Sequence, residues 1–201
     1  MPQLAVDHRE FGKQADRLLQ LLPQVSSMPP SFQKMVIEIL MLRLFSLLES
    51  TLQSITLKVL CGTHYLDLTN PTLALVSPNS SAAIANMQSH GRTKPHYQLR
   101  WTKASEIKEN VKYLLNPTDN LITVLDSHGQ LLDEMRRVRN RIAHNNADSR
   151  RKYRIVVRQY YGAFVNTVTP GVLLGSNRHS PLLIEQYIRK SKIVVKEIVK
   201  A

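Results

Sequence analysis

Apolar residues recur every three or four positions along most of this chain, a spacing that is typical of helices packed on one side. The longest such segment covers about residues 31–60, with Ser31 as its expected N-cap and Gly62 as its terminator. An earlier segment, about residues 4–22, is expected to end at Pro23, because proline lacks the N–H and clashes with the preceding turn. The pattern therefore predicts two long helices in the N-terminal third of the chain.

The remainder of the chain alternates between helical segments and breakers such as Gly129 and Thr169-Pro170-Gly171. Helices are expected over about residues 103–115, 118–126, 131–144, 149–168 and 181–199. Residues 77–100 are rich in Ser, Asn, Pro and His and predict a long basic loop between the second and third main helices, with one short helix at about 82–87. The predicted fold class is all-α, a single helical bundle.

No linker or repeat divides the 201 residues, so one domain is expected, with an N-terminal helix in residues 1–24 and a main bundle over residues 31–201. The hydrophobic content of 43% fits a chain that folds. Lysine and arginine number 27 against 15 acidic residues, which gives a formal net charge of +12. Such an excess favours polyanionic partners, although a basic protein without such a partner has the same composition.

The sequence also argues against several classes of site and location. A single cysteine, Cys61, allows no internal disulfide and no cysteine-based zinc site. The most apolar stretch, residues 35–60, is interrupted by charged side chains, and the N-terminus lacks the apolar run of a signal peptide. A cytoplasmic protein without a membrane span is therefore expected. No Gly-rich phosphate loop or metal-ligand cluster is present, so neither a cofactor nor a metal is expected.

The most informative chemistry lies at the end of the predicted helix 131–144. Arg139, Asn140 and His144 bring together a planar permanent cation, an amide and a group that exchanges protons near neutral pH. RNA carries its own nucleophile, the 2′-hydroxyl, so its cleavage requires proton transfer and stabilisation of charge on phosphorus but no metal. Arg139 falls at the edge of the apolar stripe and needs a polar partner, for which we nominate Glu49.

Each of these residues also has a simpler interpretation. A histidine in the last turn of a helix complements the negative end of the helix dipole, and His144 fits that description. Asn140 is then an ordinary surface residue, and the arginines around it form a solvated basic face. Taken one at a time, these structural interpretations are the better ones.

A resemblance favours the catalytic interpretation. Arg139-Asn140-x-x-x-His144, on the penultimate long helix, resembles the Arg-x4–6-His motif of the HEPN superfamily, in which a polar residue, often Asn, follows the arginine. Three flanking segments are similar to the subgroup called RiboL-PSP-HEPN: residues 45–49 (FSLLE), 61–67 (CGTHYLD) and 169–174 (TPGVLL). The resemblance covers about residue 31 to the C-terminus and leaves the N-terminal helix and the basic loop unmatched.

The resemblance implies a helical bundle that forms a homodimer, with the motif helices facing each other and Arg139 and His144 contributed twice. It implies a metal-independent endoribonuclease that leaves 2′,3′-cyclic phosphate and 5′-hydroxyl ends. Such family members are frequently toxins or antiphage-defence effectors, so an antitoxin or another defence-system protein is a possible partner. Other members keep the fold and only bind nucleic acid, a nucleotide or a protein, and that non-catalytic alternative stays open.

RNA binding would fall to the basic surface around the motif. The expected RNA-binding residues flank it or open the following helix: Arg136, Arg137, Arg141, Arg150, Arg151, Lys152 and Arg154. Three tyrosines of that helix are candidates for stacking on unpaired bases, although tyrosine at helical spacing is more often core: Tyr153, Tyr160 and Tyr161. A second candidate surface lies in the predicted loop and just beyond it: Arg92, Lys94, His96, Arg100 and Trp101.

Overall fold

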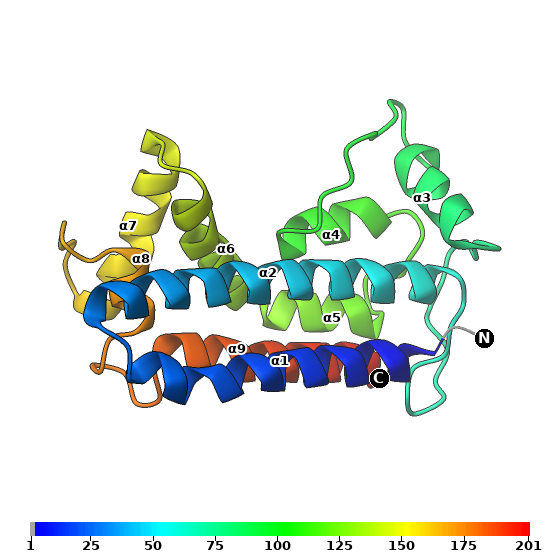
Figure 1. The fold of residues 1–201 in the computed structure, drawn as a ribbon. Coiled ribbons are helices and arrows are strands. Elements are labelled where there is room, and N and C mark those ends of the chain that lie inside the picture. The colour runs from blue at the N-terminus through cyan, green and yellow to red at the C-terminus, as the bar shows by residue number, and fades with distance from the viewer. Residues whose placement is uncertain (1–2) are drawn as a thin grey trace. The chain divides into compact units, whose positions relative to one another are not determined.

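The computed structural model describes residues 3–201, and this part of the chain is all-α, as the periodicity predicted. It contains nine α-helices and, apart from an isolated antiparallel bridge between Leu73 and Leu115, no β-structure. The helices, shown in Figure 1, are α1 (Leu4–Ser26), α2 (Pro30–Leu60), α3 (Ser80–Ser89), α4 (Ala104–Val111), α5 (Asn120–Ser127), α6 (Gly129–Ala143), α7 (Ala147–Tyr161), α8 (Pro170–Leu174) and α9 (Leu183–Val199). None of the helices described here is both long and apolar enough to cross a bilayer.

The chain divides into two compact units. The first unit consists of the chain up to Gly12, Leu48–Leu132 and Ile193–Ala201, and the second consists of Lys13–Leu47 and Asp133–Lys192. Helices α1, α2, α6 and α9 contribute residues to both units. The expectation that residues 1–201 form one domain stays a prediction. Residues 1 and 2 lie outside the part of the chain that the structure describes.

Polar side chains fix the helix ends of the first unit. Asp119 is the N-cap of α5, and its carboxylate also accepts a hydrogen bond from the buried Tyr65 hydroxyl at 2.5 Å. The side-chain amide of Asn120 donates to the carbonyls of Glu197 and Ile198 near the end of α9, at 2.9 and 3.0 Å. Helix α3 packs against α4, and α4 packs against α5. Capping groups therefore join α5 to the C-terminal helix within this unit.

A close approach of α8 to α2 characterises the second unit. Gly171 donates its backbone N–H to the Glu38 carboxylate at 2.8 Å. A Cβ atom at position 171 would lie 2.7 Å from the backbone oxygen of Lys34, so only glycine fits here without movement of α2. On the core side of the same stretch of α2, Met41 and Leu44 are completely buried. The short helix α8 thus docks through a backbone contact that a larger residue would block.

Helix α1 is longer than the sequence predicted. It continues to Ser26, so the predicted end at Pro23 is wrong, and so is the boundary at residue 24. Pro23 is exposed, so water can satisfy the carbonyl that loses its helical hydrogen bond. Leu22 and Val25 are buried on either side of the proline, and their burial favours continuation of the helix through it.

The starts of α2 and α6 also differ from the predicted ones. Helix α2 begins at Pro30, a residue suited to the first helical position because it needs no N–H partner, so Ser31 lies in the first turn and is not the N-cap. Helix α6 begins at Gly129, where a break was predicted, and it ends at Ala143. His144 is therefore the first residue after the motif helix and does not lie in its last turn.

Two further segments differ in part from the predictions. Residues 77–100 contain the expected short helix, and this helix, α3, is longer than predicted because it occupies Ser80–Ser89. Asn79 starts α3 by accepting a hydrogen bond from the Ala82 N–H. Helix α7 ends at Tyr161 and does not reach residue 168, because Gly162 takes the left-handed conformation that stops helices, with φ of 72°.

A glycine-to-alanine pair tests the docking of α8. We expect Gly171→Ala to lower the free energy of unfolding by about 1–3 kcal/mol, because its Cβ overlaps the α2 backbone. Gly12→Ala is the matched control: nothing lies within 4 Å of its Cβ, and alanine is favoured over glycine in a helix by roughly 1 kcal/mol. Urea midpoints measure both changes, and similar midpoints for the two variants would contradict the close approach at Gly171.

Candidate functional site

Arg139 is held in place by its immediate neighbours. It is half-buried on α6, and its Nη1 donates to the Asn140 side-chain oxygen at 3.0 Å. Its guanidinium carbon lies 5.8 Å from the centroid of the Phe45 ring, within the range of a cation–π contact. Asn140 therefore orients the arginine through its oxygen, and its side-chain nitrogen remains a hydrogen-bond donor.

His144 combines a fixed backbone with an exposed ring. Its N–H donates to the Asn140 carbonyl at 2.9 Å, and its own carbonyl accepts a hydrogen bond from the Ser149 hydroxyl at 2.5 Å. The residue is exposed, and within the described chain its imidazole makes no hydrogen bond. Ser149 is buried, and its N–H is itself held by the side chain of the α7 N-cap, Asn146, at 2.8 Å. This arrangement places an exposed imidazole on a backbone that is fixed by hydrogen bonds.

The motif residues of one chain are not bonded to one another as a complete site. In the described part of the chain, the Arg139 guanidinium is bound to Asn140, and no hydrogen bond joins it to the His144 ring. Glu49, the nominated partner of Arg139, lies on α2 one turn after Phe45, and it belongs to the first unit. The pairing of Glu49 with Arg139 stays a prediction.

The expected RNA-binding residues fall into three groups. Arg136 and Arg137 share the Asp133 carboxylate at 2.7 and 2.5 Å, and Arg136 is only 9% exposed. Two residues of the first turns of α7, Arg151 and Lys152, form exposed pairs with one carboxylate. All these ion pairs leave less cationic surface for RNA than the sequence count implies.

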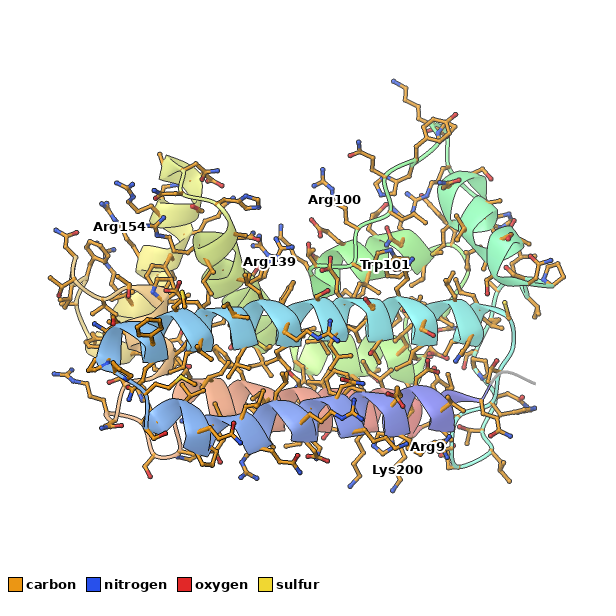
Figure 2. All side chains as sticks on the ribbon, in the orientation of Figure 1. Arg9, Arg100, Trp101, Arg139, Arg154 and Lys200 are labelled. Atoms are coloured by element: carbon orange, nitrogen blue, oxygen red, sulfur yellow. The ribbon has the colours of Figure 1, made fainter. Side chains whose placement is uncertain are left out.

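Three members of the set retain an accessible guanidinium. Arg141 donates to the Asn145 side chain at 2.8 Å and has no carboxylate partner in the described chain. Arg150 is exposed and has none either. Arg154 lies over the Phe164 ring, with 4.7 Å between the guanidinium carbon and the centroid. Figure 2 labels Arg139 on α6 and Arg154 on α7, helices that run antiparallel in the second unit.

The three tyrosines differ in their access to RNA. Tyr153 is 3% exposed, so it is a core residue, as its helical spacing favoured, and is not available to stack on a base. Tyr160 donates its hydroxyl to Glu134 at 2.6 Å, and the guanidinium of Arg178 lies 4.8 Å from the centroid of Tyr161. The half-buried Tyr161 is therefore the best placed of the three to meet an unpaired base.

The second candidate surface is less open than its composition suggests. The Arg92 guanidinium binds Glu109 at 2.9 Å, and Trp101 is 9% exposed, so its ring offers little surface for stacking. Arg100, labelled beside Trp101 in Figure 2, is exposed and lies 3.8 Å from the Glu106 carboxylate. This surface belongs to the first unit, which does not contain the motif.

Sequence analysis did not find a cluster of hydrogen bonds around the half-buried carboxylate of Glu134. Glu134 on α6 accepts hydrogen bonds from Tyr160 on α7 and Tyr187 on α9 at 2.6 and 2.5 Å, and from Gln159 at 2.9 Å. Burial raises the pKa of the Tyr187 hydroxyl, and the negative charge of Glu134 raises it further. One carboxylate thereby joins the motif helix to α7 and α9. The only signal in the sequence was an acid at a half-buried helical position.

The structure also bears on metal and thiol chemistry. Within residues 3–201, no group of three or more His, Cys, Asp or Glu side chains is arranged to hold a metal ion. Burial raises the pKa of the Cys61 thiol, which disfavours the reactive thiolate. Cys61 and His64 line a largely apolar cavity of about 650 Å³ in the first unit.

No protein-family model, curated protein or solved structure matches this chain. The HEPN resemblance therefore rests on the sequence segments that carry it, and it is a proposal.

Removal of the Ser149 hydroxyl should loosen the backbone at His144. In Ser149→Ala, the His144 carbonyl loses the donor that holds it, and we expect the amide order parameter of His144 to fall from a rigid value near 0.85 toward about 0.6. Asp148→Asn is the control, because it removes two ion pairs from the same turn without touching the hydroxyl. NMR relaxation of the labelled protein measures both, and an unchanged order parameter in Ser149→Ala would refute this role.

The buried tyrosines predict a loss of stability in alkali. Burial raises the pKa of Tyr65, Tyr153, Tyr160 and Tyr187 above the ordinary value of about 10. The contribution of these tyrosines to the free energy of unfolding is then fully present below about pH 10. It falls as pH rises further, because the unfolded chain releases these protons first. We expect Tyr153→Phe to reduce the slope of unfolding free energy against pH, by an amount that grows above pH 9 and approaches about 1.4 kcal/mol per unit near pH 11.

Tyr153 suits this measurement because its hydroxyl is buried and has no hydrogen-bond partner in the described chain. Tyr97→Phe is the control, because Tyr97 is 75% exposed. Urea titrations between about pH 8 and pH 11 give the slopes. Equal slopes in the two variants would show that Tyr153 ionises freely in the folded protein.

Proposed function

We propose that this protein is a metal-independent endoribonuclease whose active site is completed at a homodimer interface by Arg139, Asn140 and His144 of both subunits. The observation that carries the proposal is the geometry of His144, whose backbone is fixed by Asn140 and Ser149 while its ring stays open to solvent. Such a ring can exchange protons with a bound substrate. An oriented guanidinium, that of Arg139, lies on the same helix end.

The reaction follows from the chemistry of these groups. The His144 imidazole of one subunit takes the proton of the 2′-hydroxyl, and the 2′-oxygen attacks phosphorus. The bond from phosphorus to the 5′-oxygen breaks, and that oxygen receives a proton from the partner subunit's His144. Arg139 offers parallel N–H groups to the phosphate oxygens, on which negative charge grows in the transition state. The products are a 2′,3′-cyclic phosphate and a 5′-hydroxyl.

Charge and aromatic groups of the second unit support RNA as the substrate. That unit contains 17 lysines and arginines and six acidic residues, so it carries +11 of the formal net charge of +12. Arg150, Arg154 and Arg158 are exposed on α7 at intervals of four residues and form one ridge. Two arginine–aromatic pairs, Arg154 with Phe164 and Arg178 with Tyr161, present flat cations and rings suited to unpaired bases.

The second candidate function is a non-catalytic module that binds RNA or another polyanion. One observation favours it. In the described part of the chain, the Arg139 guanidinium donates a hydrogen bond to Asn140, and no hydrogen bond joins it to the His144 ring. In either case, a toxin or defence role with a restraining antitoxin or other protein partner is part of the proposal that rests on the HEPN resemblance.

Cleavage of total cellular RNA in EDTA tests the proposal. The purified protein is expected to cut and leave cyclic phosphate ends, and His144→Ala should reduce the rate by about 10²–10⁴-fold, because it loses proton transfer. His90→Ala is the matched control, because His90 is another exposed histidine and belongs to the first unit. Retention of RNA binding by His144→Ala without cutting separates catalysis from affinity. If both variants cut RNA at the same rate, the assignment of catalysis to His144 is wrong.

Mixing experiments test the composite site. If both histidines of a dimer are required, an equimolar mixture of wild type and His144→Ala, after subunit exchange, retains about a quarter of the activity, the fraction of dimers with two intact subunits. A single-chain site retains about half. The dependence of rate on the wild-type fraction, squared or linear, decides between them.

A further inference from the structure

The first half of α2 is apolar on the side that faces away from its core. Phe32, Met35 and Ile39 are 56%, 50% and 54% exposed, and the half-buried Leu42 continues their spacing of three and four residues. These four residues are called the α2 seam. The opposite side of the same turns is the core face, where Met41 is 0% exposed. The helix is thus apolar on two faces, and only one of them is covered.

The spacing of the seam indicates what shape of partner it fits. Isolated exposed apolar residues are ordinary on a protein surface, but consecutive turns of large ones mark an interaction site. Apolar positions at alternating intervals of three and four residues are the pattern that a second helix covers, with its own side chains between them. The seam therefore fits a helix, laid along α2, better than it fits an extended peptide.

The charge around the seam indicates the composition of that helix. Arg43 follows Ile39 by one turn, is exposed, and pairs with no carboxylate in the described chain. The only acidic residue of α2 within the second unit is Glu38, whose carboxylate is bound to the Gly171 N–H. The unit around the seam carries a formal charge of +11. An acidic helix is attracted to such a surface, and a basic one is repelled.

We propose that the α2 seam docks an acidic amphipathic helix of a protein partner. The apolar face of that helix covers Phe32, Met35 and Ile39, and a carboxylate beside that face pairs with Arg43. This site is separate from the chemistry of Arg139 and His144, so it stands whether or not the protein cuts RNA.

Two synthetic helices of about 21 residues test the proposal, both with leucines at intervals of three and four. One has glutamate at the flanking positions, and the other has lysine. Fluorescence anisotropy with the full-length protein is expected to detect binding of the glutamate helix alone, weaker at high salt. Ile39→Asp should weaken it at least about tenfold, because a charge enters the centre of the seam.

Matched variants keep the test specific. Ile155 on α7 is 50% exposed in the same unit and does not belong to the seam, so Ile155→Asp should leave binding unchanged. Arg43→Glu should weaken the glutamate helix severalfold and favour the lysine helix, and it leaves the apolar residues intact. Circular dichroism and urea midpoints confirm that each variant folds.

Three outcomes would overturn the proposal. Neither helix binds the wild type, or both helices bind equally, or Ile155→Asp weakens binding as much as Ile39→Asp does. A fourth is equally decisive: if sedimentation shows a dimer that Ile39→Asp makes monomeric, the seam is covered by a second copy of the chain and not by an acidic partner.

Discussion

Like-charge repulsion is the constraint under which the second unit folds. The unit has a formal charge of +11 and only six acidic residues, and each acidic residue has a defined partner inside the unit. Asp133 and Asp148 each neutralise two cations of their own helix, while Asp16 and Glu185 each pair with one cation of α9. The other two, Glu38 and Glu134, bind backbone and hydroxyl donors. No carboxylate of the unit is left over for the remaining arginines.

This distribution has a consequence for binding. Exposed ion pairs contribute little to stability, so the unit is held by its apolar core and by the Glu134 cluster, against a repulsion that persists. A bound polyanion or acidic helix relieves that repulsion, and the relief adds to the affinity of either ligand.

Helical periodicity predicted the fold class and most helices, because a side chain's angle around a helix depends only on its position in the sequence. It failed where an end depends on one backbone conformation, as at Gly162, or where burial of Leu22 and Val25 outweighs a proline. Prediction of the candidate site was limited in the same way. The position of Arg139 at the core boundary was predicted, but its contact with Phe45 was not, because the sequence does not state which helix lies opposite. The α2 seam was hidden because both faces of that helix are apolar.

The geometry of His144 bears on whether one chain suffices for catalysis. Cleavage by the 2′-hydroxyl needs one proton removed and another delivered, on opposite sides of the phosphorus. The motif supplies a single imidazole, which the fixed backbone holds in one place, and the neighbouring groups with defined contacts are an arginine and an amide. Arginine stays charged and an amide does not titrate, so neither one moves the second proton. We therefore expect a nuclease built on this motif to use the imidazole of another subunit for the second proton transfer.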